Sequence, residues 1–160
     1  MEQFFRKKIT EIIMEIKDFK HKTTLKVRFH EVDMLGVCNN ANYIHYLDEG
    51  RLEYSKAAGL VLAGGIFSDG KLSFIVRNEI NYRSHAFYDA ELDVYTKISY
   101  IKSSSYGYDH IIVKKKNGEV IADGKGVVVY VDAKTGKSIP ITDEIIEKIK
   151  NFEPDVKIIR

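Results

Sequence analysis

The feature that most constrains the fold is a series of four runs after residue 71 in which apolar residues recur at every second position. They cover residues 74–82, 92–100, 104–115 and 119–131. A period of two indicates strands with one buried face. Asn117-Gly118 separates the last two runs and is typical of a tight hairpin turn with positive φ at both positions. No helical pattern interrupts the four runs, so the sequence predicts consecutive antiparallel strands.

One long helix is expected ahead of these strands, in residues 42–58. Its apolar and aromatic side chains fall on one broad face, and Gly59 follows where a left-handed residue is favoured. Gly50 lies mid-helix on the apolar side, where it costs about 1 kcal/mol relative to Ala, and close packing against a sheet would offset this cost. One helix and several antiparallel strands predict an α+β fold whose helix covers one face of the sheet.

Three further segments complete the expected organisation. Residues 4–16 carry an apolar stripe at helical spacing, which indicates a helix docked on the protein, with a membrane-surface helix as the alternative. A strand is expected from Thr23, and Thr142 is expected to cap a short helix that extends to about Lys150. The predicted division is a helical extension at 1–22, a central domain at 23–140, and a C-terminal helix and tail at 141–160.

Composition limits the partners and the compartment. A chain of 160 residues suits one domain, and a net charge of +2 is too small to indicate nucleic-acid binding by bulk electrostatics. Cys38 is the only cysteine, so no intrachain disulfide is expected and a reducing compartment is favoured. No apolar run reaches the roughly 18 residues of a membrane span, and the N-terminus lacks a secretion signal. A cytoplasmic location, with no membrane partner, is expected by elimination.

The segment with the clearest chemistry joins the first strand to the long helix, in residues 27–43. It places the carboxylate of Asp33 a few residues ahead of a helix N-terminus. The free N–H groups and the positive end of the dipole there can stabilise an oxyanion, so this is a minimal site for acyl transfer. The structural alternative is that Asp33 caps a turn or the helix, while Asn39 and Asn40 form a turn.

This segment strongly resembles the 4-hydroxybenzoyl-CoA thioesterase family of hotdog proteins. The shared pattern is an aromatic residue ending a strand, an acidic-x-Asp triplet, a Gly-Val pair, an Asn pair and an Asn-Tyr pair that opens the helix. In this chain these are Phe29, Glu31-Val32-Asp33, Gly36-Val37, Asn39-Asn40 and Asn42-Tyr43. Arg51 and Glu53-Tyr54 match later helix positions, and weaker matches extend the resemblance over residues 23–140.

The resemblance implies a hotdog fold, an antiparallel sheet of five to six strands wrapped around a central helix, here with an extra N-terminal helix. It implies hydrolysis of acyl-CoA to free acid and CoA by a homodimer or homotetramer with active sites at the subunit interface. The family's catalytic carboxylate maps onto Asp33, and its oxyanion donor, a backbone N–H, maps onto Asn40. Substrate contacts are expected at Gly36, Val37, Asn42, Tyr43 and Val76. Relatives that act on short acyl chains often have His where this chain has Asn40.

Other residues offer alternative sites. Another hotdog branch places its catalytic acid on the helix, which makes Glu49 the second candidate carboxylate, although a surface position is favoured. Glu31 is expected to be a solvated turn residue. Cys38 could be a nucleophile paired with His30 or His45, but a small buried hydrophobe is favoured. No cofactor or metal site is expected, because the five histidines show no i, i+4 pair and no cysteine partners.

Three functional hypotheses follow. The leading one is an acyl-CoA thioesterase in which Asp33 attacks the thioester carbonyl or activates water as a general base. The second is a non-catalytic acyl-CoA or acyl-carrier binding module with the same fold, and the presence of Asp33 argues against it. The third is a dehydratase acting on a 3-hydroxyacyl thioester, which needs a helix-flanking histidine that the sequence lacks.

Overall fold

The computed structural model describes residues 16–61 and 70–159, and the fold is given for those ranges. The elements in chain order are β1 (His21–Lys26), the 3-10 helix η1 (Phe29–Glu31), α2 (Asn42–Ala57), β2 (Lys71–Tyr82), β3 (Glu91–Ile101), β4 (Ser105–Lys114), β5 (Val120–Asp132), α3 (Asp143–Phe152) and β6 (Lys157–Ile158). The expected long helix, the four consecutive strands and the C-terminal helix are therefore confirmed.

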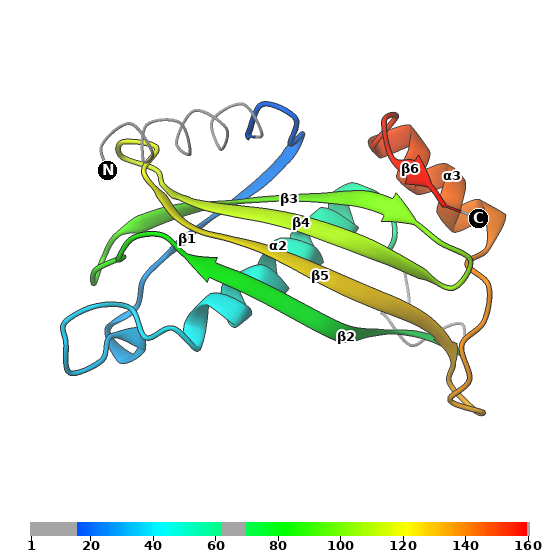
Figure 1. Cartoon of the computed structure of the whole chain (residues 1–160), viewed down its shortest axis with the longest axis horizontal. Helices are drawn as coiled ribbons and strands as arrows, with labels where there is room; N and C mark the ends of the chain where they lie inside the picture. The colour runs from blue at the N-terminus through cyan, green and yellow to red at the C-terminus, as the bar shows by residue number, and fades with distance from the viewer. Residues whose placement is uncertain (1–15, 62–69, 160) are drawn as a thin grey trace.

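The strands form one six-stranded sheet in the order β1-β3-β4-β5-β2, and β6 is a short addition beside β3. All pairs are antiparallel except β3 with β6, which is parallel. Figure 1 shows α2 crossing one face of this sheet. It shows α3 beside the end of the sheet at which β3 ends. The predicted α+β arrangement is confirmed, and β2 is an edge strand of the sheet within residues 16–61 and 70–159.

Close contact between α2 and the sheet explains the mid-helix glycine. A Cβ added at Gly50 would lie 2.7 Å from Thr96 Oγ1 and 2.9 Å from Val94 Cγ1, both on β3. No side chain fits at these distances, so glycine lets the helix approach the strand. The packing that was expected to offset its low helix propensity is present.

The hairpin between β4 and β5 differs from the prediction. Only Gly118 has positive φ, at 70°, and Asn117 does not. Lys114 N–H donates to the Glu119 carbonyl over 2.8 Å, so the loop spans residues 115–118 and is longer than a two-residue turn. In the longer loop only the last residue needs the left-handed conformation, which is why the prediction of positive φ at both positions is wrong.

The alternation predicted along β2 is interrupted by a β-bulge between Ile75 and Arg77. Ser73 and Ile75 line a pocket beside α2 before the bulge, whereas Asn78 accepts a hydrogen bond from an α2 side chain after it. An extra residue at a bulge shifts the facing of every later side chain. Phe74 therefore does not share a face with the later apolar residues of β2, as the simple period of two predicted.

Two terminal predictions can be compared with the structure in part. The helix predicted at residues 4–16 lies outside the described residues except at its last position, and β1 begins at His21, ahead of the predicted Thr23. At the other end, Thr142 Oγ1 accepts a hydrogen bond from Ile145 N–H over 3.4 Å, which confirms the predicted cap of α3. Within residues 16–61 and 70–159, no helix has the length and apolar character needed to cross a bilayer.

Candidate active site

Asp33 lies in a tight turn that follows η1. Its N–H donates to the Val37 carbonyl over 3.0 Å, and its carbonyl accepts from Gly36 N–H over 3.0 Å. Gly36 has φ of 77°, which glycine adopts without strain. The Leu35 N–H donates to Asp33 Oδ1 over 2.8 Å, which holds the carboxylate in the turn and leaves Oδ2 without a bond in the described part of the chain.

The start of α2 leaves one backbone donor without an acceptor in the part of the chain that the structure describes. Asn39 caps it, because its Oδ1 accepts from Ala41 N–H over 2.9 Å and its carbonyl accepts from Asn42 N–H over 3.0 Å. Among the described residues no group accepts a hydrogen bond from Asn40 N–H. The first N–H groups of a helix have no partner within the helix, so this donor is available to a ligand at the positive end of the dipole.

Glu31 is buried, and the expectation of a solvated turn residue is wrong. It is 7% exposed, and its carboxylate accepts from Arg28 N–H over 2.6 Å and from the Tyr46 hydroxyl over 2.8 Å. Its carbonyl accepts from Asn39 N–H over 2.8 Å and from Asn42 Nδ2 over 2.9 Å. Glu31 therefore ties the turn that carries Asp33 to the start of α2. The side-chain amide of Asn42, which was expected to contact the substrate, is therefore bound to the Glu31 carbonyl.

Cys38 is a buried small residue, as favoured by the sequence. It is 4% exposed, its Sγ lies 3.3 Å from the Tyr46 hydroxyl, and burial raises the pKa of its thiol. No histidine is among its hydrogen-bond partners in the described ranges. A raised thiol pKa disfavours the thiolate that a nucleophile needs, so the structure does not support a Cys–His pair.

The remaining sequence-predicted residues lie in different surroundings. Tyr43 is buried with its ring against Tyr46 and Tyr82, and burial raises its pKa to about 12. Val37 is half-buried, whereas Val76 is 60% exposed on β2. The sequence did not indicate the role of Tyr82, whose hydroxyl donates to the Asn40 carbonyl over 3.1 Å and joins the end of β2 to the helix start.

The second candidate carboxylate does not take part in a comparable arrangement. Glu49 is exposed on α2, and it makes no hydrogen bond or ion pair within the described residues. A solvated position agrees with the favoured surface interpretation. Within the same residues, no group of three His, Cys, Asp or Glu side chains could hold a metal ion.

A buried polar cluster lies farther along α2. Arg51 is 5% exposed, and its Nη1 lies 3.3 Å from Asn78 Oδ1 and 3.4 Å from His110 Nε2, while its Nη2 pairs with Asp48. Burial and the Arg51 charge lower the pKa of His110 to about 3. The imidazole is therefore neutral, and because Arg51 can only donate, Nδ1 carries the proton and donates to Thr96 Oγ1 over 3.0 Å.

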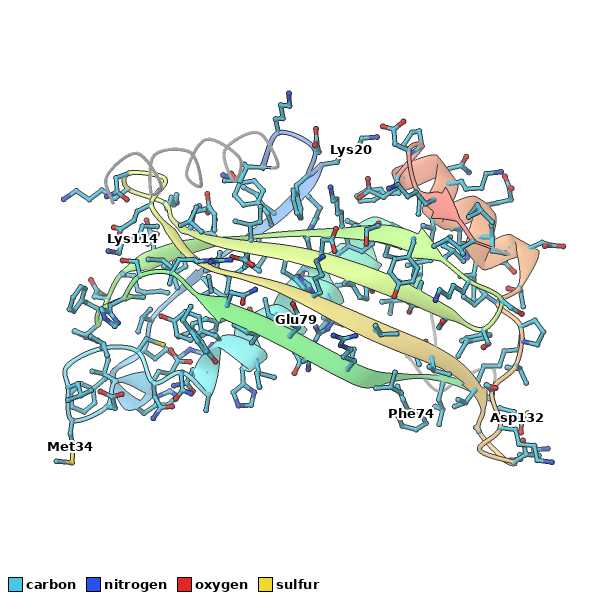
Figure 2. All side chains as sticks on the ribbon, viewed as in Figure 1. Lys20, Met34, Phe74, Glu79, Lys114 and Asp132 are labelled. Atoms are coloured by element: carbon cyan, nitrogen blue, oxygen red, sulfur yellow. The ribbon has the colours of Figure 1, made fainter. Side chains whose placement is uncertain are left out.

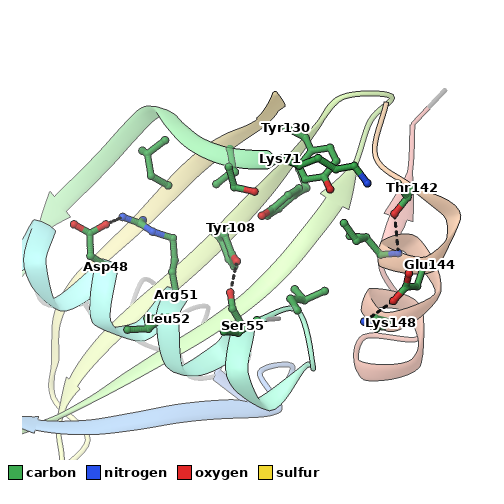
Figure 3. Close-up of a pocket in the computed structure, with 17 residues that line it drawn as sticks. Asp48, Arg51, Leu52, Ser55, Lys71, Tyr108, Tyr130, Thr142, Glu144 and Lys148 are labelled. Carbon is green, nitrogen blue, oxygen red and sulfur yellow. Dashed lines mark hydrogen bonds and ion pairs between the residues drawn. The ribbon is translucent and has the colours of Figure 1, made fainter. Parts of the chain in front are cut away.

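Beside this cluster is a pocket of about 390 Å³ between α2, the strands β2, β4 and β5, and α3. Figure 3 shows Arg51 and Ser55 extending from α2 and Lys148 approaching from α3. The Ser55 and Tyr108 hydroxyls are 3.2 Å apart at its wall. The sequence pattern gave no signal for this pocket, because its lining comes from five separate elements.

Comparison with known sequences identifies relatives over most of the chain. The sequence profile of the thioesterase-like superfamily matches residues 27–149. The long-chain acyl-CoA thioesterase FadM of Escherichia coli is 30% identical over 135 residues, which cover 82% of this chain and 98% of FadM. The chloroplastic acyl-acyl carrier protein thioesterase ATL3 of Arabidopsis thaliana is 30% identical over 132 residues, which cover 82% of this chain and 68% of that protein.

Solved structures share the fold over nearly their full length. A thioesterase from Thermus thermophilus, complexed with coenzyme A and Zn, has a TM-score of 0.72 and 27% identity, covering 86% of this chain and 97% of that one. A 1,4-dihydroxy-2-naphthoyl-CoA thioesterase from Synechocystis has a TM-score of 0.75 over 82% and 96% of the two chains, and at 17% identity it shows the fold alone. The expected hotdog fold is confirmed. The chain therefore belongs to the thioesterase-like superfamily.

Proposed function

We propose that the chain hydrolyses an acyl-CoA thioester to a free acid and CoA, with Asp33 as the catalytic carboxylate and Asn40 N–H as the oxyanion donor. Membership of the thioesterase-like superfamily makes the chain a thioester hydrolase. The observation that carries the residue assignment is the N–H of Asn40 at the start of α2, which has no acceptor among the described residues and lies a few residues beyond the turn that presents Asp33.

The two groups have complementary roles in acyl transfer. The thioester oxygen accepts a hydrogen bond from Asn40 N–H, and the helix dipole stabilises the charge that develops on it. In one route Asp33 attacks the carbonyl, CoA leaves as a thiolate that takes a proton, and water then hydrolyses the mixed anhydride. In the other route Asp33 takes a proton from the water that attacks, the C–S bond breaks, and CoA leaves as a thiolate that takes up this proton. Both routes use the ionised carboxylate.

We also propose that the active protein is a homodimer paired through β2. One edge of this strand is unpaired among the strands that the structure describes, and its exposed apolar side chains include Phe74 and Val76, which are 52% and 60% exposed. Figure 2 shows Phe74 beyond this edge of the sheet. A long apolar edge strand favours association with another strand, and antiparallel pairing with a second copy satisfies its backbone groups. The sites then lie at the subunit interface.

A panel of acyl-CoA thioesters tests the function directly. Release of the CoA thiol is followed for aliphatic and aromatic acyl groups of increasing size, and binding is measured in parallel. Turnover with at least one member is expected. Saturable binding of several acyl-CoAs without thiol release from any of them would instead favour the non-catalytic binding module.

A further inference from the structure

The face of the sheet opposite α2, here called the outer face, carries two buried apolar side chains on β4. Ile112 packs with Leu47 of α2 in the core, and successive side chains of a strand point to opposite faces. Ile111 and Val113 therefore lie on the outer face, yet they are only 2% and 4% exposed. Neither belongs to the two clusters of buried side chains that the described residues form. The cores under α2 and α3 do not explain this burial, so another cover must exclude water.

The buried area extends onto β3 and is bounded by polar residues. Tyr95 of β3 lies directly opposite Ile111 in the register, and Asp93 lies opposite Val113. The Asp93 carboxylate is buried and accepts hydrogen bonds from two side chains of β1. On the other side, Ile111 faces Asp123 of β5, whose carboxylate is paired with an arginine. The neighbouring carboxylates therefore have partners already, and the outer-face patch, defined as Tyr95, Ile111 and Val113, needs an apolar cover.

The first residues that the structure describes reach this patch. The Phe19 ring meets Tyr95 edge-on, with 6.2 Å between ring centroids, and Lys97 Nζ lies 4.6 Å from the Phe19 centroid. Phe19 N–H donates to the carbonyl of Ile16 over 3.1 Å, and Ile16 is itself helical. Figure 1 shows this stretch, in dark blue, beside β3. The chain ahead of Ile16 therefore starts at the edge of the patch.

The sequence of residues 4–16 has the pattern and the length of such a cover. Its apolar residues recur at helical spacing and form one stripe, which consists of Phe5, Ile9, Ile12, Ile13 and Ile16. A helix of this length would span about 20 Å at 1.5 Å per residue, whereas three neighbouring strands span about 10 Å. Its width of about 10 Å exceeds the separation of about 7 Å between residues two apart along a strand. The stripe is therefore large enough to cover the whole patch.

We infer that the outer-face patch is the docking surface for the chain's own residues 4–16, whose apolar stripe covers Tyr95, Ile111 and Val113. The stripe is then buried within the protein and is not available to a membrane surface, which the sequence left open as the alternative. Loss of this contact exposes both the stripe and the patch, so copies of the chain should associate through them. The inference is independent of the proposed thioesterase function, because the turn that carries Asp33 is anchored to α2 on the other face of the sheet.

A single tryptophan tests the environment of the stripe. The chain contains no tryptophan, so Ile12→Trp places the only one in the stripe, and Lys7→Trp places it on the opposite side of the predicted helix. In the full chain we expect blue-shifted emission and several-fold weaker quenching by acrylamide for Ile12→Trp than for Lys7→Trp. Equal emission and equal quenching at the two positions would contradict docking.

Charges on the outer face test where the stripe docks. Ile111→Asp places a charge in the patch, and Val127→Asp places one on the outer face of β5 away from it, because Val127 alternates with the core residue Val128. In the Ile12→Trp protein, Ile111→Asp should shift the emission to the red and raise quenching several-fold, whereas Val127→Asp should change neither. If circular dichroism shows that Ile111→Asp is unfolded, Tyr95→Ser at a half-buried ring replaces it. No shift from the patch variant, or the same shift from the control, overturns the assignment.

Two other occupants of the stripe give different results. The Ile12→Trp emission is measured again with vesicles of equal parts phosphatidylglycerol and phosphatidylcholine, and over a dilution series followed by light scattering. Docking within the chain predicts no effect of vesicles or of dilution. A blue shift that appears only with vesicles would assign the stripe to a membrane surface, and one that disappears as the mass falls would assign it to a second copy. Either result overturns the inference.

Charges in the stripe test the consequence for assembly. Ile9→Glu combined with Ile13→Glu adds two negative charges to the stripe, and Gln3→Glu combined with Thr10→Glu adds the same charge outside it. We expect the stripe variant to lose on the order of 5 °C in Tm and to gain mass in light scattering, because the uncovered patches associate. The control should change neither. A stripe variant that keeps the Tm and the mass of the wild type would show that the stripe does not cover the patch.

Discussion

The Tyr46 hydroxyl donates a 2.8 Å hydrogen bond to the Glu31 carboxylate, and this contact anchors the turn that carries Asp33 to the buried face of α2. Tyr46→Phe keeps the ring but removes the donor. We expect the free energy of unfolding to fall by about 2 kcal/mol, since a buried carboxylate loses a hydrogen bond. Denaturant unfolding measures this change.

The same substitution should also slow catalysis. A displacement of about 1 Å at a reacting group can cost on the order of 100-fold, so kcat should fall while KM changes little. Tyr54→Phe serves as the comparison for kcat, because the Tyr54 hydroxyl is buried beside the Glu153 carboxylate and not beside the turn that carries Asp33. Unchanged stability and unchanged kcat in Tyr46→Phe would mean that the contact does not position the turn.

Asp33→Asn should abolish most of the activity. The amide keeps the size and much of the hydrogen bonding of Asp33 but is a poor nucleophile and a poor base. Loss of a general base typically costs about 10²–10⁴-fold, and we expect this loss in kcat with little change in acyl-CoA affinity. Single turnover in ¹⁸O-water with the wild-type protein distinguishes the routes, since label enters Asp33 only if an anhydride forms.

Glu49→Gln is the control for this experiment and should retain most activity, because Glu49 is exposed and without a partner among the described residues. If Glu49→Gln is the inactive variant, the catalytic acid is on the helix. If Asp33→Asn keeps more than about a tenth of the rate, the carboxylate assignment is wrong.

Val76→Lys should weaken the proposed dimer. Val76 is 60% exposed at the bulge of the edge strand β2, and a charge there opposes pairing of two copies. Light scattering should show a shift toward monomer, and activity should fall in parallel. Ile158→Lys, on β6 and 42% exposed, introduces the same charge elsewhere and should leave the mass unchanged. A wild-type protein that is monomeric and fully active would refute pairing.

Because His110 is neutral in the folded protein, we expect the free energy of unfolding to decrease in acid. Its folded pKa of about 3 lies below the ordinary value of 6.5, so the unfolded chain binds the proton more readily. The stability associated with this group is complete above pH 6.5 and is lost as pH falls toward 3, by up to about 1.4 kcal/mol per pH unit. Unfolding free energies measured from pH 7.5 to 4.5 should therefore depend less steeply on pH in His110→Gln than in wild type. Equal slopes in the two proteins would contradict a neutral buried imidazole.

Several features followed from the sequence because their physical cause is local. The period-two runs predicted the antiparallel strands, and Thr142 and Gly59 marked helix ends through their own capping and backbone preferences. The acidic-x-Asp and Asn-Asn pattern identified the family and the segment that contains Asp33 and Asn40. These signals depend on neighbouring residues, which the linear sequence displays directly.

Other features were decided only by the tertiary structure. Glu31 is buried because the sheet and α2 bring the Tyr46 hydroxyl to it, and Arg51 meets His110 across 59 positions of sequence. The bulge at Val76 changes which side chains of β2 face α2. Each of these outcomes depends on the order and register of strands that are distant in the chain. A pattern of residue types indicates which face of an element is buried, but it does not indicate which residues that face will contact.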